Sequence, residues 1–203
     1  MLSLATKDSV LLKDSISNKG RNAQLELLIY ATLKEARLSP TRNKTGPDFN
    51  CTVLGQTYSV EVKRITSSNP DKIIEGIKTA RAQIKNSKKP GAIILDFSAS
   101  SNPTNEPLKA FLHPTEYRKI VDEYAIDTME RFIKPKQENL LDGSVFNVIL
   151  RCYHQIPAGK NADEFYPWTV LIRWHTMNTV PEGGRAREIS EYFETSLISK
   201  LPT

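Results

Sequence analysis

The chain has 203 residues, of which 39% are hydrophobic, and it carries a formal net charge of +5. This length suffices for one well-packed domain, and the hydrophobic share excludes an intrinsically disordered chain. No apolar run approaches the ~20 residues of a membrane-spanning helix, and the N-terminal segment meets acidic residues too early for a signal peptide, so we expect no membrane partner. Cys51 and Cys152 lie far apart, and neither they nor the three isolated histidines have metal-ligand spacing. We therefore expect a cytoplasmic protein with both thiols reduced and buried.

The first predicted element is a helix over residues 19–37. Asn18 is a candidate cap for its start, and Ser39-Pro40 ends it. Its predicted apolar face comprises Leu25, Leu28, Ile29, Ala31 and Leu33.

A hairpin, a second helix and a strand come next. Strands are predicted at 48–54 and 57–65, joined by a short turn that contains Gly55. Helical spacing over 71–86 places basic residues on one side and apolar residues on the other, and the apolar set is Ile73, Ile74, Ile77, Ala80 and Ile84. The apolar run at 92–95 is typical of a strand buried on both faces.

The second half of the chain is predicted as a helix at 115–134, strands at 144–154 and 168–176, and a C-terminal helix at 185–201. We expect these elements to extend and cover the sheet of the first half. The whole chain, 1–203, is thus predicted to be a single α/β domain.

The strand at 57–65 presents unlike side chains on its two faces, since neighbouring residues alternate. Tyr58, Val60 and Val62 can pack on a helix, whereas Ser59, Glu61 and Lys63 point the other way. Antiparallel pairing through the turn brings Asp48 beside Glu61. Two carboxylates held close repel each other unless a cation lies between them. Asp48 and Glu61 are therefore candidate ligands of a divalent cation, with Lys63 beside them to steer or deprotonate a water.

These acidic residues also have a simpler interpretation. A glutamate and a lysine two residues apart on a strand can form a surface ion pair worth under ~1 kcal/mol. Glu26, set in a run of leucines in the first helix, is either a surface charge or a member of the same site. Because the hairpin is present, we favour membership of one site for both Glu61 and Glu26.

This order of elements and these residues resemble the PD-(D/E)XK nuclease superfamily, which has the restriction-endonuclease-like fold. The resemblance covers about residues 18–97 and leaves about 108–203 as a C-terminal elaboration. It implies a core of helix, β-meander, helix and strand. One departure is that no strand is obvious before Pro47-Asp48, so we expect a very short one there.

The resemblance also implies an activity and roles for individual residues. The activity is hydrolysis of phosphodiester bonds in nucleic acid with Mg²⁺ or Mn²⁺. Asp48 and Glu61 would be catalytic metal ligands, joined by the backbone carbonyl of Val62 and by Glu26, the helix acid found in many members. Lys63 would be the catalytic motif lysine.

Positive charge is concentrated around the hairpin, which favours a polyanionic partner. Arg42 and Lys44 precede the first acid, and Arg81 and Lys85 lie on the following helix with Gln83 between them. Gln83 resembles the glutamine or basic residue that some family members carry there. We expect contacts from these five residues to nucleic acid, although a solvated helix face would carry the same charges.

We thus expect a Mg²⁺-dependent endonuclease with DNA as the favoured substrate. One alternative is a toxin-type nuclease that cleaves RNA such as transfer RNA. Another is a non-catalytic nucleic-acid-binding protein on a decayed nuclease fold, against which the intact acid–acid–lysine set argues. A cutter of both strands would need two sites, hence a homodimer or two sequential nicks.

Overall fold

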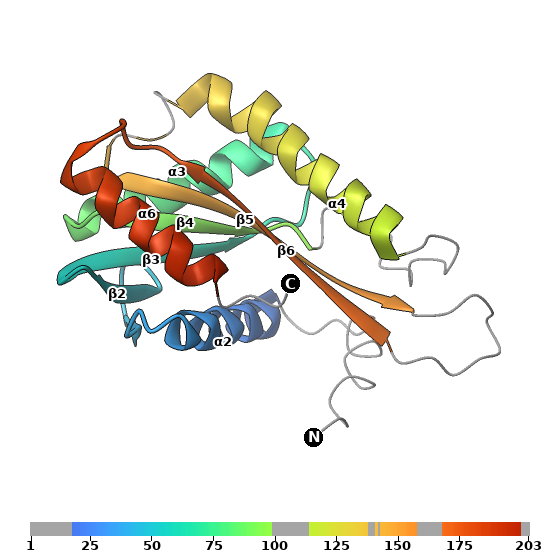
Figure 1. The fold of residues 1–203 in the computed structure, drawn as a ribbon, viewed down its shortest axis with the longest axis horizontal. Coiled ribbons are helices and arrows are strands. Elements are labelled where there is room, and N and C mark those ends of the chain that lie inside the picture. The colour runs from blue at the N-terminus through green and yellow to red at the C-terminus, as the bar shows by residue number, and fades with distance from the viewer. Residues whose placement is uncertain (1–17, 99–113, 138–140, 142, 158–167, 200–203) are drawn as a thin grey trace.

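The computed structural model describes residues 18–98, 114–137, 141, 143–157 and 168–199, which form an α/β fold around one six-stranded sheet (Figure 1). The helices of these residues are α2 (Asn18–Glu35), α3 (Pro70–Ser87), α4 (Pro114–Thr128) and α6 (Gly184–Ile198). The strands are β1 (Thr41–Arg42), β2 (Phe49–Val53), β3 (Gln56–Arg64), β4 (Gly91–Asp96), β5 (Val145–Pro157) and β6 (Trp168–Asn178).

The strands lie in the sheet in the same order as in the chain. β1, β2 and β3 form an antiparallel meander, β3, β4 and β5 run parallel, and β6 returns antiparallel to β5. The predicted α/β architecture is confirmed: the sheet is mixed, and β5 and β6 from the second half extend it. β1 is the very short strand expected before Asp48.

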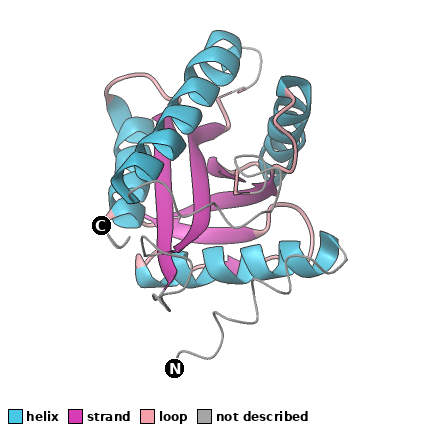
Figure 2. Cartoon of the chain, turned by 90° about the vertical axis from the view of Figure 1, so that its right-hand side faces the viewer, coloured by secondary structure: helices cyan, strands magenta, loops and turns pink. Residues whose placement is uncertain are grey.

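Helices cover both faces of the sheet (Figures 1 and 2). Val60, Val62 and Ile94 belong to a core shared with α2 and α6. The alternate residues Ile93 and Leu95 belong to a second core shared with α3 and α4. β3 and β4 are thus covered on both sides, which explains why β4 is apolar throughout its length up to Asp96.

α3 forms as its sequence predicts. Asn69 accepts a hydrogen bond from the backbone N–H of Asp71, and Pro70 occupies the first turn, where a missing N–H costs nothing. The helix ends where Lys88 adopts a left-handed conformation with φ of 57°. The residues buried are the predicted Ile73, Ile74, Ile77, Ala80 and Ile84.

The apolar face of α2 is narrower than predicted. Leu25, Ile29 and Leu33 are buried, as expected, but Leu28 is 42% exposed and Ala31 is also exposed. The buried residues follow a single i, i+4, i+8 row, so only one ridge of the helix rests on the sheet. The prediction for Leu28 and Ala31 was therefore wrong.

In the second half, the helix predicted at 115–134 ends its α-helical part at Thr128. A π-helical turn, η1 (Met129–Ile133), and a 3₁₀ turn, η2 (Lys134–Lys136), follow. Pro135 lies in η2, where its ring and its missing N–H are incompatible with a continuing α-helix. The last residues of the predicted C-terminal helix, from 200 on, lie outside the described residues.

Both cysteines are free and buried, as predicted. Among the described residues, no helix is long and apolar enough to cross a membrane.

Candidate functional site

The hairpin of β2 and β3 sets the geometry of the candidate site. Its two turn residues, Leu54 and Gly55, both have positive φ, of 48° and 78°. Such a turn matches the twist of paired strands and fixes their register. Phe49 pairs with Val60, so the next position outward places Asp48 opposite Glu61. Both carboxylates point to the face covered by α3, because directly opposed residues share a face.

Asp48 and Glu61 hold each other through the backbone. The N–H of Asp48 donates to Glu61 Oε2 at 3.1 Å, and the N–H of Val62 donates to Asp48 Oδ2 at 2.8 Å. Asp48 Oδ1 accepts no hydrogen bond from the described part of the chain. The side chain of Glu61 is 1% exposed, whereas Asp48 is half-buried.

Lys63 and Gln83 complete the group from two elements. Lys63 Nζ lies 2.5 Å from Glu61 Oε1 and 2.9 Å from Gln83 Oε1. Gln83 comes from α3, and its Nε2 donates to the carbonyl of Gly46 at 3.3 Å. The glutamine thus fixes the lysine and ties α3 to the loop before Asp48. Sequence reasoning placed both residues near the site, and the structure brings them into contact.

The environment disfavours the charged forms of both acids. Burial, followed by the nearby charge of Asp48, raises the pKa of Glu61 from 4.5 to about 7, although its bond to Lys63 acts in the opposite direction. Burial also raises the pKa of Asp48, opposed by the Val62 N–H and assisted by the charge of Glu26. One ammonium therefore does not offset two carboxylates at this depth.

Glu26 lies near this group but has its own partner. Its carboxylate, 23% exposed, forms an ion pair with Arg42 of β1. Both charges are close enough to affect the pKa of Asp48 in opposite directions. Glu26 and Arg42 thus flank the two acids as a pair, and a direct metal contact by Glu26 stays a prediction.

The other predicted contacts to nucleic acid lie around the site. Lys44 is exposed in the loop between β1 and β2, while Lys85 is exposed and Arg81 is partly buried on α3. Gln83 bonds Lys63, and Arg42 bonds Glu26. The roles of Lys44, Arg81 and Lys85 stay predictions.

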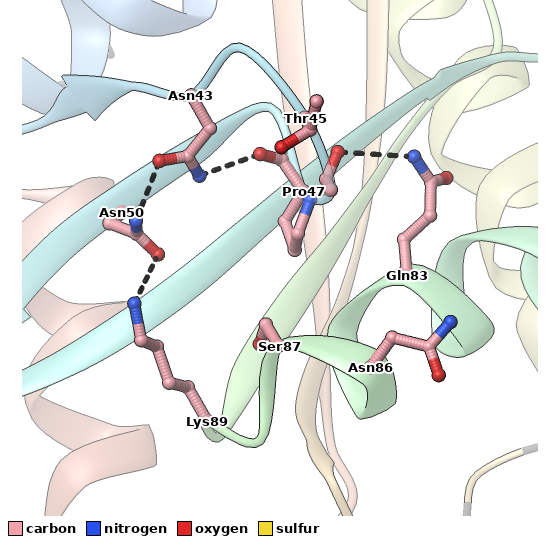
Figure 3. A pocket seen from close by; sticks show the side chains of 9 residues that line it. Asn43, Thr45, Pro47, Asn50, Gln83, Asn86, Ser87 and Lys89 are labelled. Carbon is pink, nitrogen blue, oxygen red and sulfur yellow. Dashed lines mark hydrogen bonds between the residues drawn. The ribbon is translucent and has the colours of Figure 1, made fainter.

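Asn43 and Asn50 lie beside the site, and sequence reasoning gave neither of them a role. Asn43 donates to the carbonyl of Pro47 at 2.7 Å and accepts from Asn50 at 2.7 Å, and Lys89 Nζ approaches Asn50 Oδ1 at 3.5 Å (Figure 3). The alternation of side chains along a strand could have identified Asn50, because it lies two residues from Asp48 and therefore on the same face.

A divalent cation fits the donors that are present. Among the described residues, no three His, Cys, Asp or Glu side chains converge on one point. Mg²⁺ commonly uses only one or two carboxylates, completed by waters and phosphate oxygens. Asp48 and Glu61 supply two carboxylates whose mutual repulsion a cation would relieve, and the backbone carbonyl of Val62 is the further predicted ligand.

Comparison with known proteins gives no match to a family model, to a curated protein or to a solved structure.

Proposed function

We propose that this chain is a metal-dependent nuclease of the PD-(D/E)XK type that hydrolyses phosphodiester bonds, with DNA as the favoured substrate and Mg²⁺ or Mn²⁺ as cofactor. One observation carries the proposal. Two acids with raised pKa values stand opposite each other on one hairpin, with an ammonium bonded to the more buried acid. The element order, α2 then β1–β3, α3 and β4, supports the restriction-endonuclease-like core.

In this proposal each residue of the site has a separate task. Asp48, Glu61 and the carbonyl of Val62 would hold the cation, which would supply a water of lowered pKa and offset charge that builds on the phosphate. Lys63, held in place by Gln83, orients or deprotonates the attacking water and adds positive charge. Because Glu61 is buried, its proton must leave before it can act as a ligand.

Glu26 and Arg42 have a linked part in the proposal. The carboxylate of Glu26 is engaged by Arg42, so Glu26 can join the metal ligands only if Arg42 moves to another anion. A phosphate of the substrate is such an anion, and a guanidinium binds it well. Arg42→Ala should therefore weaken binding of nucleic acid more than it lowers the rate of cleavage at saturation.

The test is cleavage of plasmid DNA, single-stranded DNA and transfer RNA with Mg²⁺, Mn²⁺ or EDTA. We expect cleavage with either metal and none with EDTA. Glu61→Ala and Lys63→Ala should each lose about 100-fold or more in rate. Glu75→Ala, which removes an exposed acid of α3 paired with Lys72, is the matched control and should cut like the wild type.

The outcomes separate the alternatives. Preferred cleavage of transfer RNA would assign the site to the RNA-cleaving alternative. Binding without cleavage under any metal would favour the non-catalytic alternative. Unchanged cleavage by Glu61→Ala would refute the mechanism. Whether a homodimer supplies two sites, and whether the protein is cytoplasmic, stay predictions.

A further inference from the structure

The face of the hairpin that carries Asp48 and Glu61 continues into a polar hollow. Asn50 pairs with Ser59, two residues further along each strand, so these side chains share that face. A hollow of about 360 Å³ lies here between the hairpin and the C-terminal end of α3 (Figure 3). Gln83, which fixes Lys63, also lines this hollow, so it adjoins the candidate site.

The lining of this hollow, which we call the amide hollow, is dominated by side-chain amides. They belong to Asn43, Asn50, Gln83 and Asn86, and Lys89 is the one cation among the lining residues. Hydrogen bonds from Asn50 to Asn43, from Asn43 to Pro47 and from Gln83 to Gly46 fix its walls. The amide of Asn86 is exposed and has no hydrogen bond to the described residues, so it is available to a ligand.

A second hollow of about 370 Å³ adjoins the first at Lys89, which lines both. We call it the lysine hollow, because Lys85 and Lys88 line it as well. The half-buried ring of Phe146 supplies part of its apolar lining. The candidate site, the amide hollow and the lysine hollow thus adjoin one another in this order, first at Gln83 and then at Lys89, and we call this order the path.

We propose that one unpaired stretch of the substrate strand follows this path, with a base in the amide hollow and the neighbouring phosphates at the lysine hollow. This inference rests on the proposed function and narrows its substrate to nucleic acid with a single-stranded segment. An amide offers a donor and an acceptor side by side, as the edge of a base requires. A phosphate in the amide hollow would find only the ammonium of Lys89, whereas Lys85 and Lys88 add two further cations at the lysine hollow.

The requirement for an unpaired strand follows from access. A base inside a duplex is stacked and paired, so it enters a pocket only after it leaves the helix, at a cost of a few kcal/mol. A strand that is already single does not bear this cost. DNA and RNA share this chemistry, and the experiment treats them as separate arms.

The first test measures binding of the full chain in EDTA, by fluorescence anisotropy, so that no cleavage occurs. The probes are labelled single strands of about 12 nucleotides, as DNA and as RNA, and a DNA duplex of the same length. We expect at least one single strand to bind about tenfold or more tighter than the duplex. Equal or tighter binding of the duplex would overturn the proposal.

The second test assigns the phosphates to the lysine hollow. Lys88→Ala should reduce the slope of log K against log salt concentration by about 0.7, the value expected for one lost phosphate contact on a single strand. Lys119→Ala, an exposed lysine of α4 paired with Glu123, is the control of equal charge and should leave the slope unchanged. An unchanged slope for Lys88→Ala, or equal changes for both variants, would refute this placement.

The third test assigns the base to the amide hollow. An abasic residue is moved along the single strand, and we expect one position at which its loss of base weakens binding severalfold. In Asn86→Ala the same abasic strand and the intact strand should bind alike. An abasic penalty that persists undiminished in Asn86→Ala would overturn the assignment.

These outcomes are independent of catalysis. Cleavage with Mg²⁺ combined with failed binding tests would leave the nuclease proposal intact and refute the path. Successful binding tests without cleavage under any metal would do the reverse.

Discussion

Two buried ionic groups lie on opposite faces of the same sheet, and they differ in balance. On the α3 face, Asp48 and Glu61 share one ammonium, that of Lys63. On the α2 and α6 face, Asp96 of β4 bonds Arg151 of β5 at 2.8 Å. The hydroxyl of Ser98 also donates to Asp96, and the guanidinium of Arg151 lies 5.8 Å from the centre of the Trp174 ring.

The difference teaches which group has a structural task. A one-to-one pair with additional hydrogen bonds offsets most of its own desolvation, so Asp96 and Arg151 tie two parallel strands together. Two acids with one partner retain excess negative charge, which costs stability while no cation is bound. We therefore interpret Asp96 and Arg151 as structure, and Asp48, Glu61 and Lys63 as a site.

The largest expected effect comes from breaking the ion pair between Asp96 and Arg151. Asp96→Asn leaves Arg151 charged and buried, since the side chain of Arg151 is 4% exposed. We expect a loss of about 3–5 kcal/mol in the free energy of unfolding, measured with urea. Asp127→Asn removes an acid paired with Arg131 on the surface and should cost under ~1 kcal/mol. Similar losses in the two variants would contradict the assignment.

The second prediction concerns how the site of Asp48, Glu61 and Lys63 makes the stability of the protein depend on pH. The folded chain keeps a proton on Glu61 up to about pH 7, whereas the unfolded chain releases it near 4.5. Stability contributed by this group is therefore present below pH 4.5 and is lost as the pH rises to about 7, by roughly 3 kcal/mol.

Glu61→Gln should remove this loss, so the metal-free variant should exceed the wild type in stability above pH 7. Urea unfolding of both proteins at several pH values measures the difference. The control is Glu75→Gln, an exposed acid that should track the wild type. A parallel pH dependence for wild type and Glu61→Gln would rule out the raised pKa.

The third prediction tests the close approach of β4 to β3, which helps to bring α3 over Asp48 and Glu61. A Cβ at Gly91 would stand 2.4 Å from the carbonyl oxygen of Ser59, so β4 can approach β3 here only with glycine. Gly91→Ala should cost about 1–3 kcal/mol, by urea unfolding. Gly76→Ala, in the interior of α3 where a Cβ meets only the tip of Ile65, should cost less or stabilise. Equal costs would show that the approach of the strands is not the cause.

The smallest expected effect concerns the turn that sets the register of Asp48 against Glu61. Leu54 adopts a positive φ of 48°, which asparagine tolerates better than leucine. Leu54→Asn should raise the melting temperature, by a gain of about 0.5–1 kcal/mol. The matched change Leu27→Asn, at a residue 69% exposed on α2, should instead lower it. A loss at Leu54 as large as at Leu27 would disprove strain at the turn.

The parts of the fold that were predictable are those with short-range causes. Residues close together in the sequence determine the periodicity and the caps of α3. They also determine the two-residue turn that places Asp48 beside Glu61. The spacing of apolar residues in α2 does not show how many of them contact the sheet. The prediction that Leu28 belongs to the buried face is therefore wrong.

Other features depend on contacts that no local pattern encodes. Asp96 and Arg151 meet only because β4 and β5 pair in parallel across 55 residues of sequence. The amide hollow likewise requires the loop before Asp48 to fold against the end of α3. The pairing of Glu26 with Arg42 depends on where β1 joins the sheet.

The central claim is that Asp48 and Glu61 together hold a divalent cation. A titration of the full chain with Mn²⁺, followed by electron paramagnetic resonance above and below pH 7, tests it directly. We predict saturable binding that strengthens as the pH rises through about 7 and that is lost in Asp48→Asn and in Glu61→Gln, while Glu75→Gln binds like the wild type. Absence of saturable binding to the wild type, or binding by either site variant that equals that of the wild type, would contradict the claim.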